Sequence, residues 1–427
     1  MFIQSFAILL VLVALSLPIA AVLLIVGLTM GWLHSPMPLY VAGSEIFWKV
    51  ANEFTLTTIP LFVLLGELLL RAGVAERMYA ATALWLNRLP GGLLHANIAA
   101  STLFSATSGS SVATAATIGT VALPEVERRG YNERLFLGSL AAGGTLGILI
   151  PPSIHLILYG MMTQSSIPQL YSAAMLPGLL LALIFSGIVA LICILRPEMG
   201  GQRIEATWKQ RFESLPSILP VVGLFIVVVG SIYAGIATPT EAAALGLLFA
   251  LVLAAFYGRL SVRMLNEAFV ATMRTTAMIM LIVMVSYFLN FILSFLGIPQ
   301  ALTRFVSELG LSPTGTIVLI VVFFVALGCF LESLSMLVTM TPLVAPIVIG
   351  MGFDPIWFGV LLTILLEVAL ITPPVGINLY VVQAIRKRGG MGDVIVGSLP
   401  FVVAMFVLIG LLIAFPQIAL WLPSLSG

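Results

Sequence analysis

The sequence predicts an all-α polytopic membrane protein with two inverted-topology repeats, each containing a re-entrant helical hairpin and a helix broken by a double proline. Three observations predict this fold. The 427 residues are 61% hydrophobic and 8% charged, whereas a water-soluble protein carries about a quarter charged residues. Two apolar stretches are interrupted at Pro151-Pro152 and at Pro373-Pro374, 222 positions apart. The arginines gather in clusters, which indicate the side of the membrane on which each loop lies.

The first apolar segment, Phe6–Trp32, is long enough to span the hydrocarbon core. It lacks a basic n-region and a convincing cleavage site, so we interpret it as a retained first helix, broken or kinked near Pro18. The N-terminus is then expected to be cytoplasmic. The two cysteines, Cys193 and Cys329, have neither the number nor the spacing of a disulfide framework or a metal site. A net charge of +1 gives no indication of a nucleic-acid partner.

The basic residues form five clusters: Arg71 to Arg88, Arg128 to Arg134, Arg196 to Arg211, Arg259 to Arg274, and Arg386 to Arg388. If all five are cytoplasmic, only Lys49 and Arg304 of the 18 basic residues lie outside. The chain between Arg88 and Arg128 then begins and ends on the same side. Its polar middle, Ser105–Ser111, favours a re-entrant hairpin over two full spans.

The second half of the chain repeats the first. At an offset of 222, Pro124 matches Pro346, Gly130 matches Gly352, Phe136 matches Phe358, and the double prolines coincide. The polar tip Ser105–Ser111 falls on Leu327–Ser333. Chance similarity between apolar segments is the alternative. The charge clusters place the ends of the first hairpin inside and those of the second outside, so the repeats are expected to be inverted.

The expected organisation follows from these signals. Residues 1–57 form the first membrane helix and a periplasmic connection, and residues 58–195 form repeat 1, with a hairpin near 91–127 and a broken helix at 135–160. A cytoplasmic linker at 196–217 and scaffold helices at 218–270 follow. Repeat 2 covers 271–388, with a hairpin near 313–350 and a broken helix at 355–385, and 389–427 form a C-terminal helix with a periplasmic end.

Several residues of the apolar regions are candidates for function. Broken membrane helices expose backbone groups that bind ions, and charges inside the membrane are functional candidates. The Ser105–Ser111 tip could coordinate a cation and a substrate, or it could only pack helices closely. Glu332 is the best candidate for a sodium-site or gating carboxylate, and Glu367 also lies in the apolar region of repeat 2.

Other polar residues have simpler interpretations. Glu67 has Arg71 one turn away, which indicates a helix pair, and Glu241 follows Thr238 with the spacing of a helix start. His155 follows the first break and could contact substrate, although the sequence favours a packing role. The long apolar runs contain no Lys or Arg, so an anionic substrate would depend on helix N-termini, hydroxyls and bound cations.

The chain resembles the large membrane subunit of TRAP transporters, the tripartite ATP-independent periplasmic systems. The stretches that carry the resemblance are Ile59–Arg77, Gly91–Tyr131, Ile150–Gly160, Leu331–Ile347 and Ile371–Val381, so it covers nearly the whole chain. It implies an elevator-type, sodium-driven importer in the inner membrane of a bacterium, for a carboxylate-bearing organic anion such as a C4-dicarboxylate or a sialic acid. It also implies a separate small four-helix membrane subunit and a periplasmic substrate-binding protein.

The resemblance also implies where the ligands lie. One sodium site would pair the first tip with the first break, through Ser105, Ser108, Gly109, Gly144, Thr145 and Pro151. The second sodium site would use Gly328, Glu332, Ser333, Ala369, Thr372 and Pro373. Substrate would contact Ser110, Ser111, Ser153 and Asn378. The second tip has fewer hydroxyls than the first, which leaves its individual ligands open.

Two alternatives remain at this point. One is a one-component dicarboxylate carrier or sodium–proton antiporter with similar broken helices, which would work without a periplasmic protein. The other is a non-transporting subunit of a respiratory or intramembrane enzyme complex. The near-absence of central Lys residues argues against that second alternative, as does the separation of His95 and His155. The sequence therefore favours a transporter and not an enzyme.

Overall fold

The computed structural model describes residues 1–425. Within them the regular secondary structure is helical, apart from an isolated antiparallel bridge between Tyr131 and Gly200. Seven of the described helices are long and apolar enough to cross a membrane, or eight if the bent pair Trp208–Ser217 and Leu219–Tyr233 counts as one span. The prediction of an all-α polytopic membrane protein is confirmed.

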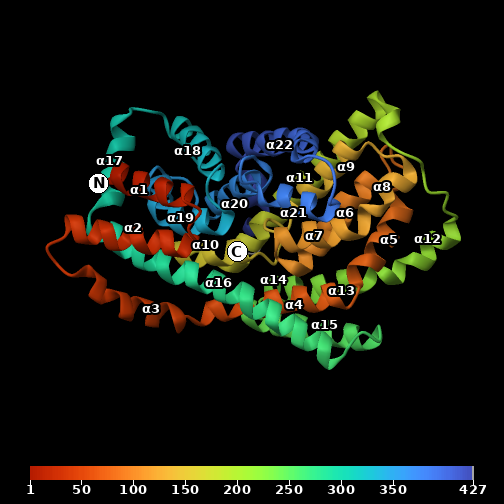
Figure 1. The fold of residues 1–427 in the computed structure, drawn as a ribbon, viewed down its shortest axis with the longest axis horizontal. Helices are drawn as coiled ribbons and strands as arrows, with labels where there is room; N and C mark the ends of the chain where they lie inside the picture. Colours follow the sequence, from red (N-terminus) through yellow and green to blue (C-terminus); the bar gives the residue numbers. More distant parts are fainter. Residues whose placement is uncertain (426–427) are drawn as a thin grey trace.

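The N-terminal segment folds back on itself. Helices α1 (Phe2–Ala14) and α2 (Ile19–His34) pack together and are joined by a short turn. His34 Nε2 lies 2.8 Å from Gln4 Oε1, so the start of α1 and the end of α2 lie at the same end of the molecule (Figure 1). The predicted break near Pro18 is present, but the prediction of one first membrane helix over Phe6–Trp32 is wrong, because the turn reverses the chain. A cytoplasmic N-terminus therefore no longer follows from a single crossing.

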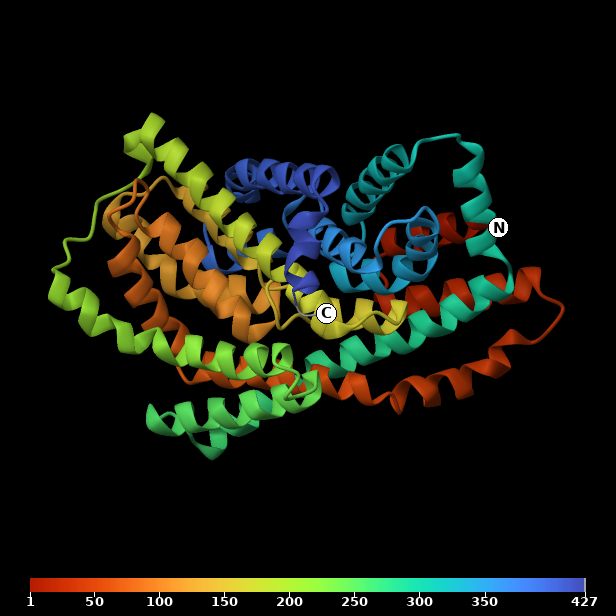
Figure 2. The ribbon, with the colours of Figure 1, turned by 180° about the vertical axis from the view of Figure 1, so that it is seen from behind.

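A layer of helices runs along one long side of the molecule, at the lower edge of Figures 1 and 2. Its members are α3 (Gly43–Ala51), α4 (Thr58–Arg71), α13 (Leu219–Phe225), α14 (Ser231–Tyr233), α15 (Pro239–Phe256) and α16 (Val262–Phe295). A π-helical turn, Ile226–Gly230, joins α13 to α14. The 34 residues of α16 include no Gly or Pro. Helix α16 therefore runs through the expected boundary at residues 270 and 271, and that boundary is wrong, because nothing there breaks the helix.

The segment expected to be a linker, residues 196–217, is held against the first repeat. It contains α12 (Trp208–Ser214) after an extended stretch. In that stretch the Ile204 N–H donates to Asn87 Oδ1 at 2.7 Å, and the Gln202 N–H donates to the Arg129 carbonyl at 2.8 Å. These bonds fix the segment against the ends of α5 (Val74–Leu86) and α8 (Pro124–Arg129).

The first repeat has the expected hairpin and broken helix. Its helices are α5 (Val74–Leu86), α6 (Leu93–Ser108), α7 (Ser111–Ala122), α8 (Pro124–Arg129), α9 (Glu133–Thr145), α10 (Ile154–Thr163) and α11 (Ile167–Leu195). Helices α6 and α7 form the hairpin, with Gly109 and Ser110 at its tip. Helices α9 and α10 are the two halves of the broken helix, separated by residues 146–153, which include the double proline.

The second repeat has the same order. Its helices are α17 (Ile298–Glu308), α18 (Pro313–Gly328), α19 (Ser333–Gly350), α20 (Pro355–Ile371), α21 (Ile377–Arg386) and α22 (Met391–Ala414). The hairpin tip is at residues 329–332 and the break at residues 372–376. A further helix, α23 (Gln417–Ser424), packs on α11, so the C-terminal segment forms two helices and not one. The predicted periplasmic C-terminus lies at residues 426–427, outside the described residues.

Equivalent positions of the two repeats share unusual backbone conformations. Left-handed glycines precede α5 and α17 and follow α8 and α19, and side-chain caps begin α9 and α20. The pairs are Gly73 (φ 72°) with Gly297 (φ 71°), Gly130 (φ 63°) with Gly352 (φ 88°), and Asn132 with Asp354. Such local features do not arise from general hydrophobicity, so they exclude chance similarity as the explanation for the repeat.

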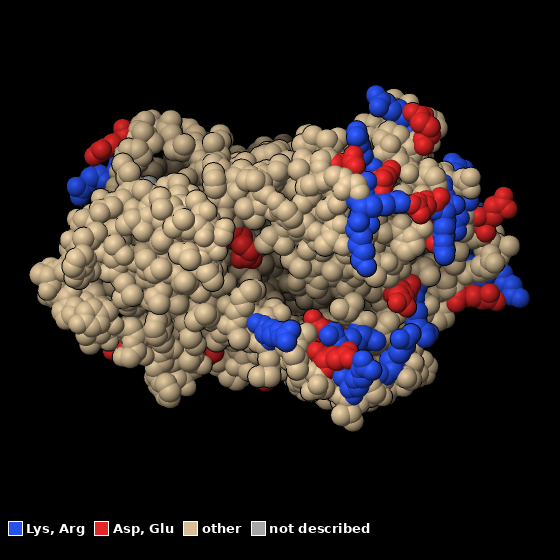
Figure 3. Space-filling view, in the orientation of Figure 1, with Lys and Arg blue, Asp and Glu red and all other residues tan. Residues whose placement is uncertain are grey.

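The two hairpins enter from opposite ends of the molecule. Helices α6, α7 and α8 lie near one end, and α17, α18 and α19 lie near the other (Figure 1). Most of the charged side chains on the visible face gather at the end that carries α5, α8 and α12 (Figure 3). This arrangement is the inverted topology that the charge clusters predict.

The repeats are interlocked through their broken helices. Helix α9 of the first repeat packs along α22 of the second, and α20 of the second packs against α11 of the first. At the α9–α22 crossing, Gly138 and Gly397 face each other. A Cβ on Gly138 would lie 1.8 Å from the Gly397 carbonyl oxygen. Only glycine permits this approach.

An ion-pair cluster joins the repeats at the arginine-rich end. The Arg386 side chain is 5% exposed and lies 2.9 Å from Glu133 and 3.1 Å from Asp393. Arg134 also lies 2.8 Å from Asp393. The hydrogen bond to Glu133 and the charge of Asp393 raise the pKa of Arg386 above its ordinary value, so Arg386 stays charged. The cluster connects the starts of α9 and α22 to the end of α21.

We expect Arg386→Gln to lower the melting temperature of the purified protein by roughly 2 to 4 °C, because the carboxylates it faces lose a largely buried partner. Differential scanning fluorimetry in detergent measures this shift. Arg128→Gln is the control, because Arg128 is 74% exposed in its pair with Glu125 and should contribute almost nothing. Equal shifts for both variants would contradict a structural role of the cluster.

Candidate functional site

The two hairpin tips and the two helix breaks meet at one cavity of about 410 Å³. Its wall includes Ser108–Ala113 from the first tip, Glu332–Leu334 from the second, Ile148, Ile154 and His155 from the first break, and Leu370 and Ile377 from the second. Phe104 of α6 and Ala116 and Thr117 of α7 extend the wall of the first hairpin. The remaining wall comes from α4, through Val63, Gly66, Glu67 and Leu70, and from α16, through Thr275, Met278 and Ile279. The cavity therefore lies between the repeat elements and the side layer, and the space-filling view shows a hollow in the middle of this face (Figure 3).

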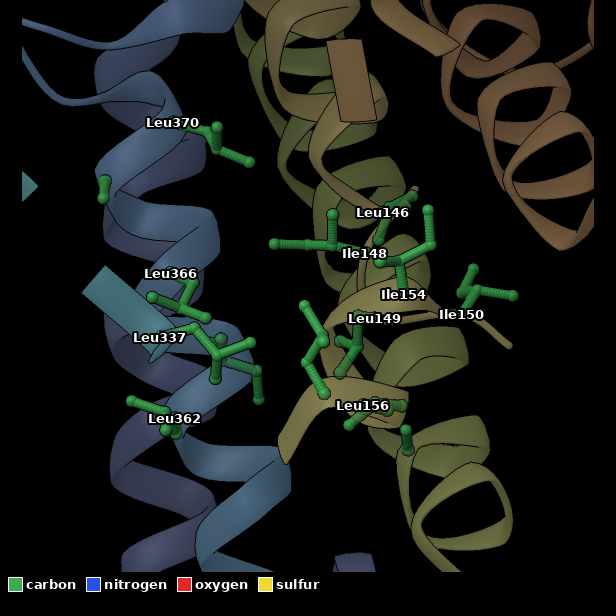
Figure 4. Packing of buried hydrophobic residues seen from close by; sticks show 14 of the residues in the cluster. Leu146, Ile148, Leu149, Ile150, Ile154, Leu156, Leu337, Leu362, Leu366 and Leu370 are labelled. Atoms are coloured by element: carbon green, nitrogen blue, oxygen red, sulfur yellow. The ribbon is translucent and has the colours of Figure 1, made fainter. Parts of the chain in front are cut away.

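Apolar side chains hold the helix breaks in place. Residues around the first break pack with residues of α19 and α20, and the labelled members are Leu146, Ile148, Leu149, Ile150, Ile154, Leu156, Leu337, Leu362, Leu366 and Leu370 (Figure 4). All ten are buried. Close packing of this kind fixes the half-helix ends, because displacement would lose many dispersion contacts at once.

Four helix N-termini converge on the cavity. Helices α7, α10, α19 and α21 all begin in its wall, at Ser111, Ile154, Ser333 and Ile377. Their first N–H groups carry partial positive charge, which attracts anions. None of the described residues that line the cavity is Lys or Arg. An anion in the cavity would therefore be held by backbone N–H groups and hydroxyls.

Three of the four predicted substrate residues lie at the cavity or next to it. Ser110 and Ser111 line it, and Asn378 Nδ2 donates to Ser111 Oγ at 2.7 Å and to the Ala141 carbonyl at 3.1 Å. Asn378 is fully buried, and its Oδ1 has no hydrogen-bond partner within residues 1–425. Ser153 instead caps α10 and donates to the Ile148 carbonyl, so its hydroxyl serves the break itself.

The first predicted sodium site brings the tip and the break into contact. Gly109 has φ 59°, and a Cβ there would lie 2.8 Å from the Pro152 carbonyl oxygen, which directly follows Pro151. A Cβ on Gly144 would lie 2.6 Å from Ala115 Cβ. The hydroxyl groups of the predicted ligands form local hydrogen bonds. Ser105 Oγ donates to the Ser101 carbonyl at 2.6 Å, and Thr145 Oγ1 donates to the Ala142 carbonyl at 2.8 Å. Ser108 Oγ lies 3.0 Å from Thr114 Oγ1.

At the second predicted sodium site the close contact is between α18 and α20. A Cβ on Gly328 would lie 2.6 Å from Ala369 Cβ, which places the end of α18 against α20 just before the break at Pro373. Glu332 caps α19 by accepting from the Leu334 and Ser335 N–H groups, each at 3.1 Å. Ser333 Oγ lies 3.3 Å from Glu332 Oε1, and Thr372 Oγ1 donates to the Val368 carbonyl at 2.6 Å.

His155 lies where the two repeats meet. It lines the cavity, and its Nε2 lies 3.1 Å from Ser333 Oγ, so it links the first break to the second tip. The sequence signal for this position was that His155 lies in the first turn of α10, the helix that follows the break. The wall from α16, including Thr275, gave no signal in the sequence, because only tertiary packing brings it to the tips.

The two interpretations of acidic residues outside the tips are confirmed. Glu67 forms an ion pair with Arg71, one turn along α4. Glu241 accepts from the Thr238 N–H at 2.8 Å, while Thr238 Oγ1 accepts from the Glu241 N–H at 3.4 Å, which is a capping box. Cys193 and Cys329 are both free.

Discontinuous helices whose ends meet at a cavity inside an inverted repeat define a class of protein, the secondary membrane transporters. Over residues 6–418 the chain matches the family model described as "Tripartite ATP-independent periplasmic transporter, DctM component". The chain belongs to this family. It is a transporter permease subunit and not an enzyme, and membership in a tripartite family implies a small membrane subunit and a periplasmic binding protein as partners.

Named relatives agree with this assignment. The C4-dicarboxylate TRAP transporter large permease protein of Rhodobacter capsulatus is 33% identical over 99% of this chain and 98% of its own length. The sialic acid TRAP transporter large permease protein of Vibrio cholerae is 32% identical over 96% and 95%. The ectoine TRAP transporter large permease protein of Halomonas elongata is 32% identical over 87% of each chain.

A solved structure shares the fold. The YdaH transporter of Alcanivorax borkumensis, described as having an unusual topology, superposes with a TM-score of 0.60 over 96% of this chain and 99% of its own. The sequence identity is 16%, so this likeness concerns the fold alone.

Proposed function

We propose that the chain is the translocating subunit of a sodium-coupled, binding-protein-dependent importer of a carboxylate-bearing organic anion, working by an elevator movement in the bacterial inner membrane. The observation that carries the proposal is the cavity at which four helix N-termini meet without a basic side chain. Relatives named for C4-dicarboxylates, sialic acid and ectoine act on compounds that all contain a carboxylate. Such a group fits the N–H groups at the starts of α7, α10 and α21, since the first N–H groups of α19 donate to Glu332.

Sodium, the second cargo, fits the opposite helix ends. In each repeat the first hairpin helix and the first half of the broken helix, α6 with α9 and α18 with α20, end close to each other. Helix C-termini carry partial negative charge and unpaired carbonyls, which suit a small cation. Each repeat would thus hold a cation beside the shared anion, and the two cargoes would stabilise each other electrostatically.

An elevator movement is supported by the composition of the cavity wall. One wall belongs to α4 and α16, and the others belong to the hairpins and breaks. At the contact between them, a Cβ on Gly66 would lie 3.3 Å from Ser108 Cα, so a smooth backbone surface faces the first tip. We propose that the hairpins and broken helices slide along this surface as one transport domain, while α4 and α16 stay in place as the scaffold.

Uptake by the reconstituted complex tests the function. The large and small membrane subunits in proteoliposomes, supplied with the binding protein, should take up one of labelled succinate, N-acetylneuraminate or ectoine when sodium is higher outside. Equal uptake with potassium in place of sodium would overturn the coupling. Uptake without the binding protein would support a one-component carrier instead.

Two substitutions test the tips in the same assay. We expect Ser108→Ala and Glu332→Ala each to lower the uptake rate at least tenfold, because each removes an oxygen from a tip that lines the cavity, while both complexes still assemble. Glu213→Ala, in an exposed pair with Lys209, is the control and should transport normally. Unchanged uptake in both tip variants would show that these side chains are not part of the transport site.

A further inference from the structure

One carbonyl of the second hairpin lacks its ordinary helical partner. In an α-helix each carbonyl accepts from the N–H group four residues further along the chain. For the Val338 carbonyl in α19 that residue is Pro342, which has no N–H group. Val338 is fully buried, so bulk water does not reach it. Inside a membrane such a carbonyl requires a donor from another part of the protein.

A side chain of the neighbouring helix supplies this donor. Asn290 Nδ2, on α16, donates to the Val338 carbonyl at 3.3 Å. Helix α16 also packs against α2, α3 and α4 and belongs to the side layer, whereas α19 is the second helix of the second hairpin. The hydrogen bond therefore joins the proposed scaffold to the proposed transport domain.

The Asn290 side chain makes one polar contact. Its Oδ1 is buried and has no hydrogen-bond partner within residues 1–425. The partner of Nδ2 is a backbone carbonyl, which can only accept, so the amide nitrogen must face α19. One hydrogen bond therefore has to break when α19 moves along α16, and the same bond can form again when α19 returns.

The first hairpin does not need such a donor. At the offset of 222 that aligns the double prolines, the two positions on α19 correspond to Ala116 and Thr120 on α7. Thr120 keeps its N–H group, and its Oγ1 also donates to the Ala116 carbonyl at 2.7 Å. The first hairpin instead meets α4 through the close approach of Gly66 to Ser108. The two hairpins therefore contact the side layer differently, the first by backbone packing and the second by a hydrogen bond.

We propose that Asn290 is a positioning residue of the transport cycle. Its bond to the carbonyl that Pro342 leaves free holds the second hairpin on the scaffold in the arrangement described above, and this bond breaks when the transport domain slides. Asn290 lies outside the wall of the central cavity, so it acts through α19 and not on the cargo. The proposal rests on the proposed elevator movement and assigns one of its end positions to a defined polar contact.

A disulfide can report how often the transport domain occupies this arrangement. A Cβ on Gly66 would lie 3.5 Å from Ser108 Cβ, and the Cβ atoms of a disulfide are about 3.5 to 4.5 Å apart. Gly66→Cys and Ser108→Cys are combined in the complex of large and small membrane subunits in proteoliposomes, with Cys193 and Cys329 replaced by alanine. The rate of disulfide formation with copper phenanthroline as oxidant then measures the occupancy.

Asn290→Leu has a similar volume and no donor, so we expect it to slow cross-linking by roughly fivefold or more, the effect of losing one hydrogen bond to a buried carbonyl. Asn290→Gln keeps an amide donor and should retain most of the rate. Pro342→Ala gives α19 its own N–H group for Val338, so Asn290→Leu should have little effect when the two are combined. Thr276→Val is the matched control, because its hydroxyl on the same helix has no hydrogen-bond partner within residues 1–425.

Three results would count against the inference. Cross-linking is also measured in sodium chloride with a mixture of succinate, N-acetylneuraminate and ectoine. If this mixture changes the rate and Asn290→Leu does not, the domain slides and the role of Asn290 is overturned. If neither changes the rate, the sliding movement fails as well. If Asn290→Leu slows cross-linking equally with and without Pro342→Ala, the side chain acts by packing and not through the freed carbonyl, which also overturns the inference.

Discussion

Replacing Gly397 by alanine is expected to abolish assembly of the folded permease. A Cβ at this position would lie 1.8 Å from the Arg134 carbonyl oxygen, although real Cβ atoms keep at least 3.0 Å. Both clashing groups belong to helix backbones, so no side-chain rotation relieves the clash. Helices α9 and α22 would have to separate, and the close packing along their whole contact would be lost.

Fluorescence-detected size exclusion and uptake assays measure this effect. Gly397→Ala should give aggregated or poorly expressed protein, with uptake reduced to background. Gly410→Ala on the same helix is the control, because no heavy atom lies within 4 Å of a Cβ there, and it should behave as wild type. A monodisperse Gly397→Ala protein with normal uptake would show that the α9–α22 contact is not as close as described.

Asn378→Ala is expected to reduce uptake at least tenfold while the protein still folds. Asn378 starts α21 and donates to Ser111 at the start of α7 and to the Ala141 carbonyl of α9. Without this side chain Ser111 loses its hydrogen bond, so the first tip and the second break are no longer held together at the proposed anion site. Loss of a buried hydrogen-bonded group costs about 1 to 3 kcal/mol, which is five- to more than a hundredfold in an equilibrium constant.

The measurement is uptake rate against substrate concentration, together with the melting temperature. Asn52→Ala removes an exposed amide that bonds only to the Trp48 carbonyl, and it should change neither quantity. The double variant with Ser111→Ala should lose little more than Asn378→Ala alone, because the two side chains form one unit. Additive losses would mean that Asn378 and Ser111 act separately.

Local signals made most of the site predictable from the sequence. Proline breaks a helix wherever it stands, so both breaks could be located from the double prolines alone. Small polar residues in an apolar run marked the first tip, and the repeat then located the second at residues 329–332. The spacing of Thr238 and Glu241 predicted a cap for the same local reason.

Features that depend on packing were not predictable. The turn between α1 and α2 reverses the chain because α2 packs on α16, and a proline alone does not set the angle of a bend. The scaffold boundary was misplaced because it followed the arginine clusters, and Arg274 does not interrupt a helix. The sequence predicted a sodium-site or gating carboxylate at Glu332, but its bonds to the Leu334 and Ser335 N–H groups could not be predicted, because they depend on the conformation of the tip.

The interlocked repeats have a consequence for synthesis of the protein. Gly138 must meet Gly397, which the ribosome adds 259 residues later, about 13 to 52 seconds at 5 to 20 residues per second. During that time α9 inserts without its main packing partner, with its glycine-rich surface open to lipid or to a chaperone. Truncated chains that end before residue 391 lack α22, so we expect the proteases of membrane quality control to degrade them.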